Sequence, residues 1–178
     1  MKYKWILGID PSGSFTEGKG TTGICLIDAE TLQIIHAEDI TARSFTSKED
    51  YWEHHLHTIR SFLQRPNRKN RFNDTMIVIE DYILYANKAQ SQINSRMETP
   101  KLIGIIQLWC TQNNIPYTMQ FAHEVKNRWK DNILEWKGIL KRKNGRFQYN
   151  EHIRDSIRHA VHYAVFKNKE VRKWDLKM

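Results

Sequence analysis

The sequence predicts one α/β domain over residues 1–178, in which helices cover both faces of a five-stranded mixed sheet. The first half contains three apolar runs separated by short turns, a pattern typical of antiparallel strands. The second half alternates short apolar runs with segments of helical periodicity, as expected for parallel strands joined by helices. The order of three strands and a helix, followed by two further strand and helix pairs, therefore predicts a three-layer fold.

The three N-terminal strands are expected in the segments KWILGI, TGICLID and TLQIIHAEDI, with a glycine-containing loop between the first two. The segment SKEDYWEHHLHTIRSFLQ comes next and ends before Pro66, and its apolar residues recur at helical spacing. These apolar residues are Trp52, Leu56, Ile59 and Leu63. We therefore expect an antiparallel meander followed by one amphipathic helix.

Two further strands are expected in TMIVIE and IPYTMQF, and the first is apolar almost throughout, as in a strand covered on both faces. Between them, TPKLIGIIQLWCTQ predicts a helix with Thr99 as its N-cap and Pro100 at the first helical position. A short helix in HEVKNRWK and a basic loop, KGILKRKNGRFQYN, precede the last helix, EHIRDSIRHAVHYAVF. The expected core face of that helix consists of Ile153, Ile157, Ala160, Val161 and Ala164.

The composition limits the class of partner. A net charge of +8 and a pI near 9.5 favour an acidic polymer, with nucleic acid first, although a basic surface that serves only solubility would look the same. No run approaches the roughly 20 apolar residues of a membrane span, and no signal peptide is recognisable, so we expect no membrane partner. Cys25 and Cys110 stand alone in apolar surroundings, which predicts reduced core residues in a cytoplasmic protein.

Two short motifs are set aside. GSFTEGKGT nearly matches a phosphate-binding loop, but Gly20 takes the place of the magnesium-binding hydroxyl, and the loop leads into a strand rather than a helix. The histidines of HHLH (residues 54, 55 and 57) lie in a helical segment without partner ligands, so we expect no metal there.

Asp10 and Glu80 each terminate an apolar strand. If the two strands are neighbours, the two carboxylates emerge side by side, where they would repel each other unless a cation lies between them. The last helix carries His152 and Asp155 three residues apart on one face, and Glu151 and Asp155 form a second acidic pair. The simpler interpretation is that each acid caps its strand or helix, or pairs with a surface lysine.

Three carboxylates and a histidine suit hard divalent ions such as Mg²⁺ or Mn²⁺. Two such ions about 4 Å apart activate a water molecule and stabilise the departing oxygen in phosphodiester hydrolysis. The glycine loop after Asp10 would then keep bulky side chains away from the metal and from a backbone phosphate.

Three segments together resemble the RuvC-type Holliday junction resolvases of the RNase H-like nuclease superfamily. They are ILGIDPS…TTGICLID, IVIEDY and HIRDSIRHAVHY, and they occur in the family's order. The resemblance implies an RNase H-like fold, a homodimer, four-way DNA junctions as substrate, and two Mg²⁺ ions per active site, with Mn²⁺ able to substitute. The implied catalytic and metal-binding residues are Asp10, Glu80, His152 and Asp155. The family has Asp or His at the position of His152, so direct metal binding and water activation both stay open for that residue.

The resemblance also extends to AHEVKNRW, which implies that Lys126 lies near a DNA phosphate. The following basic segment is expected to neutralise phosphates, and its aromatic residues Trp129, Trp136 and Phe147 either pack or stack on bases. The expected cationic DNA contacts are Lys126, Arg128, Lys130, Lys137, Lys141, Arg142, Lys143 and Arg146. After Glu80, the expected contacts are Tyr82, Tyr85 and Lys88.

Two departures from the bacterial enzymes affect what the resemblance implies. FTEGKG is an apparent insertion after Asp10, and EDYILYANKAQSQ does not match closely. They favour a phage-encoded relative acting in the bacterial host cytoplasm, and they leave the cleavage sequence open. Two other functions stay open as well: an RNase H-like nuclease that cuts RNA–DNA hybrids or flaps, and a non-catalytic protein that binds branched DNA. An actin-like ATPase would need a second nucleotide-binding half, for which 178 residues leave no room.

Overall fold

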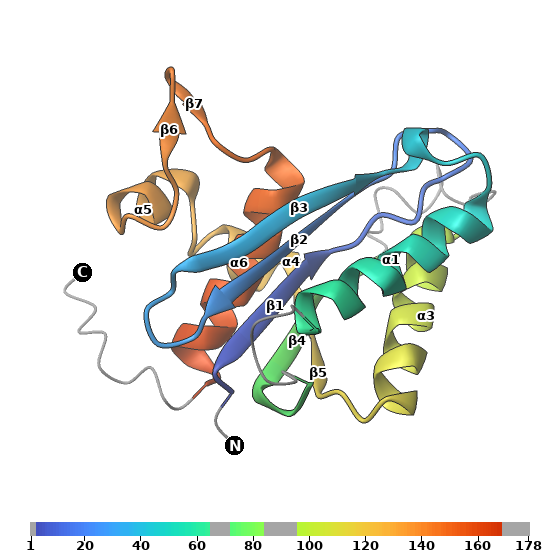
Figure 1. Ribbon diagram of the computed structural model, residues 1–178. Coiled ribbons are helices and arrows are strands. Elements are labelled where there is room, and N and C mark those ends of the chain that lie inside the picture. Colours follow the sequence, from blue (N-terminus) through green and yellow to red (C-terminus); the bar gives the residue numbers. More distant parts are fainter. Residues whose placement is uncertain (1–2, 65–71, 84–95, 169–178) are drawn as a thin grey trace.

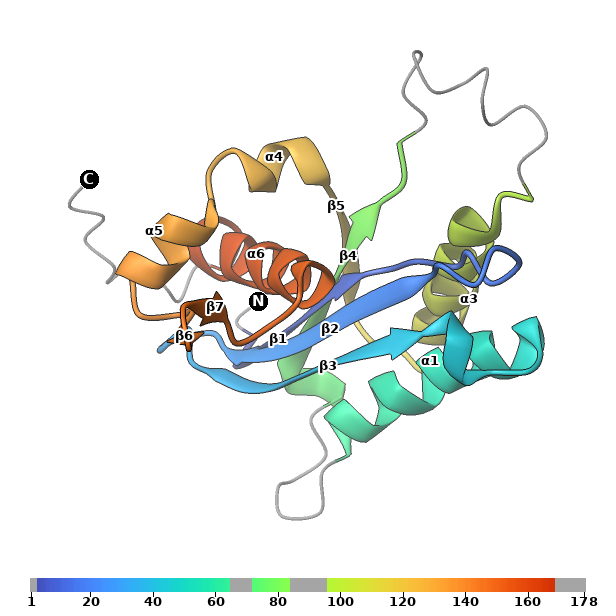
Figure 2. The same ribbon diagram turned by 90° about the horizontal axis from the view of Figure 1, so that it is seen from above.

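A computed structural model describes residues 3–64, 72–83 and 96–168. Its centre is a five-stranded sheet in the order β3-β2-β1-β4-β5, with helices on both faces (Figures 1 and 2). The strands are β1 (Trp5–Asp10), β2 (Thr21–Asp28), β3 (Ile34–Thr41), β4 (Thr75–Asp81) and β5 (Tyr117–Phe121). The predicted mixed α/β sheet with three layers is therefore confirmed.

The sheet changes from antiparallel to parallel at β1. β1 pairs with β2, and β2 with β3, in antiparallel register, whereas β1 pairs with β4, and β4 with β5, in parallel register. The meander follows from the short turns, and the parallel pairs follow from the long connections that cross over the sheet. As a result, β1 and β4 both point toward the same edge of the sheet.

Two layers of helices enclose the sheet. Helices α1 (Lys48–Leu63) and α3 (Glu98–Gln112) share one hydrophobic core with one face of the sheet. On the other face lie α6 (Glu151–Phe166), the short α4 (Ala122–Lys126) and the short α5 (Asp131–Trp136). Short 3₁₀ turns at Ala42–Ser44 and Phe72–Asp74 precede α1 and β4.

Helix α6 lies directly against the two central strands. All five residues of its predicted core face are buried, and they belong to the same core as β1 and β2. A Cβ atom on Gly8 would lie 2.1 Å from the Ser156 carbonyl oxygen, and one on Gly23 would lie 2.1 Å from that of His152. Only glycine therefore allows the backbone of α6 to approach β1 and β2 so closely.

The buried face of α1 differs from the predicted stripe. Ile59 and Leu63 are buried as expected, whereas Trp52 and Leu56 are only partly buried. The core side of the helix also contains polar atoms, because His55 is fully buried and its Nε2 lies 2.8 Å from the Thr22 hydroxyl. All four residues of the predicted stripe thus pack on the core, and apolar spacing left out the buried, hydrogen-bonded histidine.

The start of α3 also differs from the prediction. The helix begins at Glu98, its N-cap is Met97 in a left-handed conformation, and Thr99 lies in the first turn. The Thr99 hydroxyl instead accepts a hydrogen bond from the backbone N–H of Gly13 at 3.1 Å, and a Cβ on Gly13 would lie 2.2 Å from the Glu98 carbonyl oxygen. Thr99 therefore holds the loop after β1 and does not cap its own helix.

The segment predicted as a basic loop contains two short paired strands. It forms a hairpin of β6 (Arg142–Lys143) and β7 (Arg146–Phe147), preceded by α5, which the sequence analysis did not identify. Asn144 and Gly145 both have positive φ, at 52° and 75°, as the tightest hairpin turns require. The Asn-Gly pair was therefore a hairpin signal in the sequence.

Two expectations about burial and membranes can be compared with the structure. Cys25 and Cys110 are buried and free, as predicted. In the described part of the chain, none of the helices has both the length and the apolar character needed to cross a bilayer.

We predict that Gly23→Ala destabilises the fold by about 1–3 kcal/mol, because the new Cβ overlaps the α6 backbone. Gly104→Ala is the matched control, since nothing lies within 4 Å of a Cβ there. The control should be neutral or should gain up to about 1 kcal/mol of helix stability. Urea denaturation of both variants measures the difference, and equal stabilities would contradict the close approach of α6.

We also predict that His55 makes the fold sensitive to acid. Burial lowers the pKa of His55 to about 4. Because the unfolded chain takes up the proton near pH 6.5, this contribution to stability is complete above that pH and is lost as the pH falls toward 4. Between pH 7 and pH 5, His55→Gln should lose about 2 kcal/mol less stability than the wild type. Equal losses in urea denaturation at both pH values would contradict this.

Candidate active site

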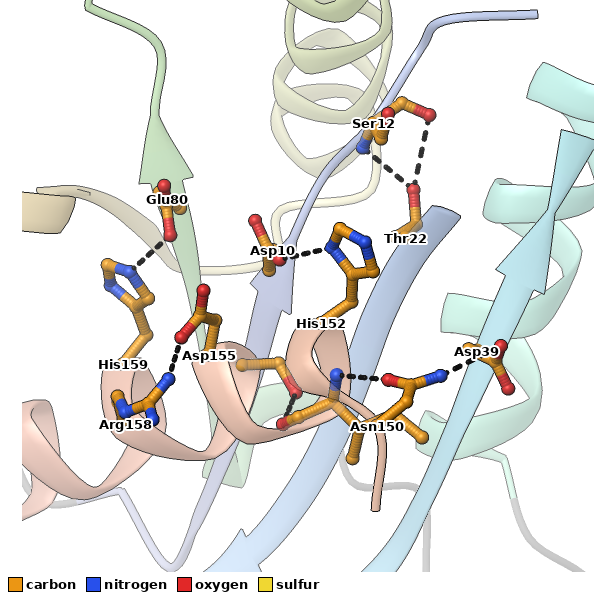
Figure 3. A network of polar contacts seen from close by, with 12 residues as sticks. Asp10, Ser12, Thr22, Asp39, Glu80, Asn150, His152, Asp155, Arg158 and His159 are labelled. Atoms are coloured by element: carbon orange, nitrogen blue, oxygen red, sulfur yellow. Dashed lines mark hydrogen bonds and ion pairs between the residues drawn. The ribbon is translucent and has the colours of Figure 1, made fainter. Parts of the chain in front are cut away.

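Asp10 and Glu80 lie next to each other at the edge to which β1 and β4 point. Ile9 of β1 is the register partner of Ile79 of β4, so the residue after each lies at the same level of the sheet. Their side chains are 14% and 17% exposed. The predicted juxtaposition of two largely buried carboxylates is therefore present, as Figure 3 shows.

Helix α6 adds two more of the predicted residues to this edge. Its N-cap is Asn150, whose side-chain oxygen accepts from the backbone N–H of Ile153 at 3.0 Å and whose side-chain nitrogen donates to Asp39 at 3.1 Å. This cap attaches the start of the helix to β3. His152 and Asp155, in the first turns, consequently face Asp10 and Glu80 (Figure 3).

His152 is bonded to Asp10. Its Nδ1 donates to the Asp10 carboxylate at 3.0 Å, and this hydrogen bond raises the pKa of His152 despite partial desolvation. Burial raises the pKa of Asp10; the bond from His152 opposes that shift, and the negative charge of Glu80 adds to it. The raised pKa of Asp10 reflects a second carboxylate nearby in a poorly solvated site.

Glu80 has a partner that the sequence analysis missed. The buried His159 places Nε2 at 2.9 Å from the Glu80 carboxylate and Nδ1 at 2.9 Å from Gln120 of β5. Burial alone would raise the pKa of Glu80, but the bond from His159 and the charge of Lys126 outweigh it, so the pKa lies below its ordinary value. His159 follows Asp155 by four residues, so helical spacing would have revealed it.

Asp155 is held by two cations. Lys126, at the end of α4, places its ammonium group 2.8 Å from Asp155 and 3.9 Å from Glu80. On the other side, Arg158 donates to Asp155 and to Asp131, the first residue of α5. The Asp155 side chain is only 6% exposed, so these cations supply the charge compensation that water cannot.

Side chains of β2 and α1 hold the loop after Asp10 in place. The backbone N–H of Ser12 donates to the Thr22 hydroxyl at 2.9 Å, and its carbonyl accepts from the Tyr51 hydroxyl at 2.5 Å. His55 completes this network through Thr22. The contacts of Gly13 and Gly23 with neighbouring helix backbones give these glycines a packing role in addition to the accessibility expected from the sequence.

The donor chemistry of the cluster fits a hard divalent cation. Asp10, Glu80 and Asp155 bring carboxylate oxygens from three elements together, and the Lys126 ammonium already occupies a position between two of them. In the parts of the chain that the structure describes, no group of three or more His, Cys, Asp and Glu side chains is arranged to hold a metal ion. The predicted ligands are therefore assembled as a charge-compensated cluster.

The other predicted DNA contacts lie outside this cluster. Tyr85 and Lys88 fall outside the described residues, and Tyr82 packs against the core shared by α1 and α3. Three cations contact aromatic rings: Arg128 lies over Phe166, Lys137 over Trp136 and Arg142 over Phe147. The remaining cations are exposed: Lys130, Lys141, Lys143 and Arg146.

The three aromatic residues of this segment differ from one another. Trp129 is buried, and the partly buried Phe147 packs against the same core and contacts Arg142 and Arg154 at ring distances of 4.0 Å and 5.1 Å. Packing is therefore the correct interpretation for these two. Trp136 is 74% exposed, so the packing interpretation is wrong for that residue.

Comparison with known proteins gives a match at the level of structure. No protein-family model matches the chain, and no curated protein matches it. Among solved structures, the chain is similar to T. thermophilus RuvC in complex with Holliday junction substrate, with a TM-score of 0.69 and 16% sequence identity. The match covers 94% of this chain and 97% of that chain. The protein therefore has the RuvC-like fold that its sequence motifs indicated.

Proposed function

We propose that this protein is a metal-dependent endonuclease that resolves four-way DNA junctions and related branched DNA by paired phosphodiester hydrolysis. The observation that carries the proposal is the cluster of Asp10, Glu80 and Asp155 at one sheet edge of a RuvC-like fold. Three largely buried carboxylates, two of them in contact with Lys126, are costly to assemble without a functional reason. The solved RuvC structure, which holds a Holliday junction substrate, favours branched DNA as the substrate.

The proposed metal ligands are Asp10, Glu80 and Asp155, with His152 beside them. Two Mg²⁺ ions, or Mn²⁺ in their place, would supply activation of water and neutralisation of charge on the phosphate. His159 fixes the orientation of the Glu80 carboxylate, and Arg158 fixes that of Asp155. Lys126, with its side chain 46% exposed, would release the carboxylates when metal binds and turn to a DNA phosphate.

The active form is proposed to be a homodimer. Two symmetric cuts across a four-way junction need two active sites, and a two-fold pair of identical chains provides them. The exposed cations of the segment between α4 and α6 would neutralise phosphates of the bound DNA. This part of the proposal accounts for the net charge of +8.

We predict that Asp10→Asn abolishes cleavage of a labelled four-way junction in Mg²⁺ or Mn²⁺ while junction binding survives. The loss should exceed about a hundredfold, more than the removal of a residue that only orients a ligand. Because the pKa of Asp10 is raised in the fold, its ionised form opposes folding above pH 4. The variant should therefore melt at the same temperature as the wild type or higher at pH 7.

Asp74→Asn is the matched control, because Asp74 is exposed and lies just before β4, at its opposite end. This variant should cut at the wild-type rate. Equal cleavage by Asp10→Asn and the wild type would show that the active site lies elsewhere. Junction binding without any cut by the wild type would favour the non-catalytic binder, and preferential cutting of RNA–DNA hybrids or flaps would favour the other nuclease.

We predict that His159→Ala lowers cleavage by about 10–100-fold and raises the Mn²⁺ concentration needed for half-maximal activity, since Glu80 loses the group that orients it. His159→Gln keeps a hydrogen-bond donor and should recover part of the loss. Thermal melting of both variants separates this effect from general unfolding. An unchanged Mn²⁺ requirement in a folded His159→Ala protein would contradict a positioning role.

A further inference from the structure

The β6–β7 hairpin has two chemically different faces. Its register pairs Arg142 with Phe147 and Lys143 with Arg146. Side chains alternate along a strand, so the two pairs point to opposite sides of the hairpin. One face therefore carries Arg142 over the ring of Phe147, and the other face carries the two cations Lys143 and Arg146.

The face with Arg142 and Phe147 holds the hairpin in place. Arg142 donates to Glu135 of α5 at 2.8 Å and to the Gly145 carbonyl at 3.1 Å, and it lies 4.0 Å from the Phe147 ring centre. Arg154 of α6 covers the same ring at 5.1 Å. Arg142 is thus occupied by contacts within the protein, and the Phe147 ring is in contact with two guanidinium groups.

The face with Lys143 and Arg146 has no compensation of this kind. Both residues are exposed, and within the described part of the chain neither has an ion-pair partner. Like charges directly opposite each other on paired strands repel and destabilise the pair. Lys143 and Arg146 flank an open hollow lined also by Asn144, Phe147 and Gln148. An anion held between the two cations would turn this repulsion into attraction.

The position of the hairpin relates it to the candidate active site. Figure 1 shows it projecting beyond the sheet, and in both views the chain runs from it directly into the start of α6. His152 follows Arg146 by six positions, so their Cα atoms lie at most about 22 Å apart. Successive phosphates of one strand advance about 3.4 Å along the axis of a DNA duplex. A phosphate within about six nucleotides of the bond to be cut is therefore in reach.

We propose that Lys143 and Arg146 form a phosphate-binding pair that holds the backbone of a duplex arm of the DNA substrate. This inference rests on the proposed function and specifies which part of the substrate the hairpin contacts. Both side chains of the pair are cationic, so the pair binds the phosphate backbone and does not read base edges. Arg142, which the sequence analysis grouped with these residues, is a structural part of the hairpin.

The test compares Lys143→Ala, Arg146→Ala and Lys143→Glu with Arg60→Ala, an exposed arginine of α1. Binding to a four-way junction and to a linear duplex is measured from low to high salt, with Ca²⁺ in place of Mg²⁺ to prevent cutting. Each alanine variant should lower the slope of log affinity against log salt by about one, equally for both DNAs, because one phosphate contact is lost. Arg60→Ala should match the wild type.

Lys143→Glu separates a binding role from a structural one. It places opposite charges across the hairpin, so the melting temperature should stay equal or rise while DNA affinity falls more than in Lys143→Ala. Salt slopes equal to that of Arg60→Ala, in a protein that still cuts junctions, would overturn the phosphate-binding pair and leave the proposed function standing. Lower salt slopes in a protein that never cuts junctions would support the phosphate-binding pair and contradict the proposed nuclease function.

Discussion

The direct contact of α6 with the two central strands is the constraint on which the rest of the site depends. At Gly8 and Gly23 the helix backbone lies where a side chain would otherwise be. Gly23 is the register partner of Asp10, and the atom it accommodates is the carbonyl oxygen of His152. The same glycine that lets the helix approach therefore places His152 within hydrogen-bond distance of Asp10.

This contact brings three carboxylates together in a poorly solvated site, and each of them is bonded to its own partner. Asp10 is bonded to His152, Glu80 to His159, and Asp155 to Arg158 and Lys126. An unpaired carboxylate at such burial would be protonated or would disrupt the fold. The partners differ in accessibility, because His159 is fully buried, whereas the side chains of His152 and Lys126 are almost half exposed. Buried partners fix orientation, and exposed partners are free to leave when another cation arrives.

The sequence predicted the fold well because its strands and last helix are strongly patterned. The apolar run that ends at Glu80 and the stripe on α6 each fit one kind of element, and both lie where periodicity places them. Prediction was less successful where a polar side chain bonds to a residue far away in the sequence and not to its own helix or strand. Thr99 has the residue type of an N-cap, but its hydroxyl is bound to Gly13, 86 positions earlier. No local pattern contains that information.

The candidate site shows the same division. Strand ends and helical spacing brought Asp10, Glu80 and Asp155 into one hypothesis, because each position follows from local periodicity. Gln120, the register partner of Glu80 on β5, was not singled out, because its role depends on the buried His159, which bonds to both side chains. The difference between Arg142 and Lys143 is also tertiary. The two are neighbours of similar charge in the sequence, and only the hairpin register and Glu135 separate their roles.

Two arginines of α6, Arg154 and Arg158, connect the hairpin to the carboxylates. Arg158 joins Asp155 to Asp131 at the start of α5, and Arg154 both pairs with Asp131 at 3.0 Å and covers Phe147 of the hairpin. Of these pairs only Arg158–Asp155 is buried, and removing one of its partners would cost about 3–5 kcal/mol because one charge is left without a partner. The hairpin is attached to the helix that carries His152 and Asp155 through the contact of Arg154 with Phe147. A duplex arm held at the hairpin would consequently be placed at a defined distance from the carboxylates, and the position of the cut would follow from this geometry.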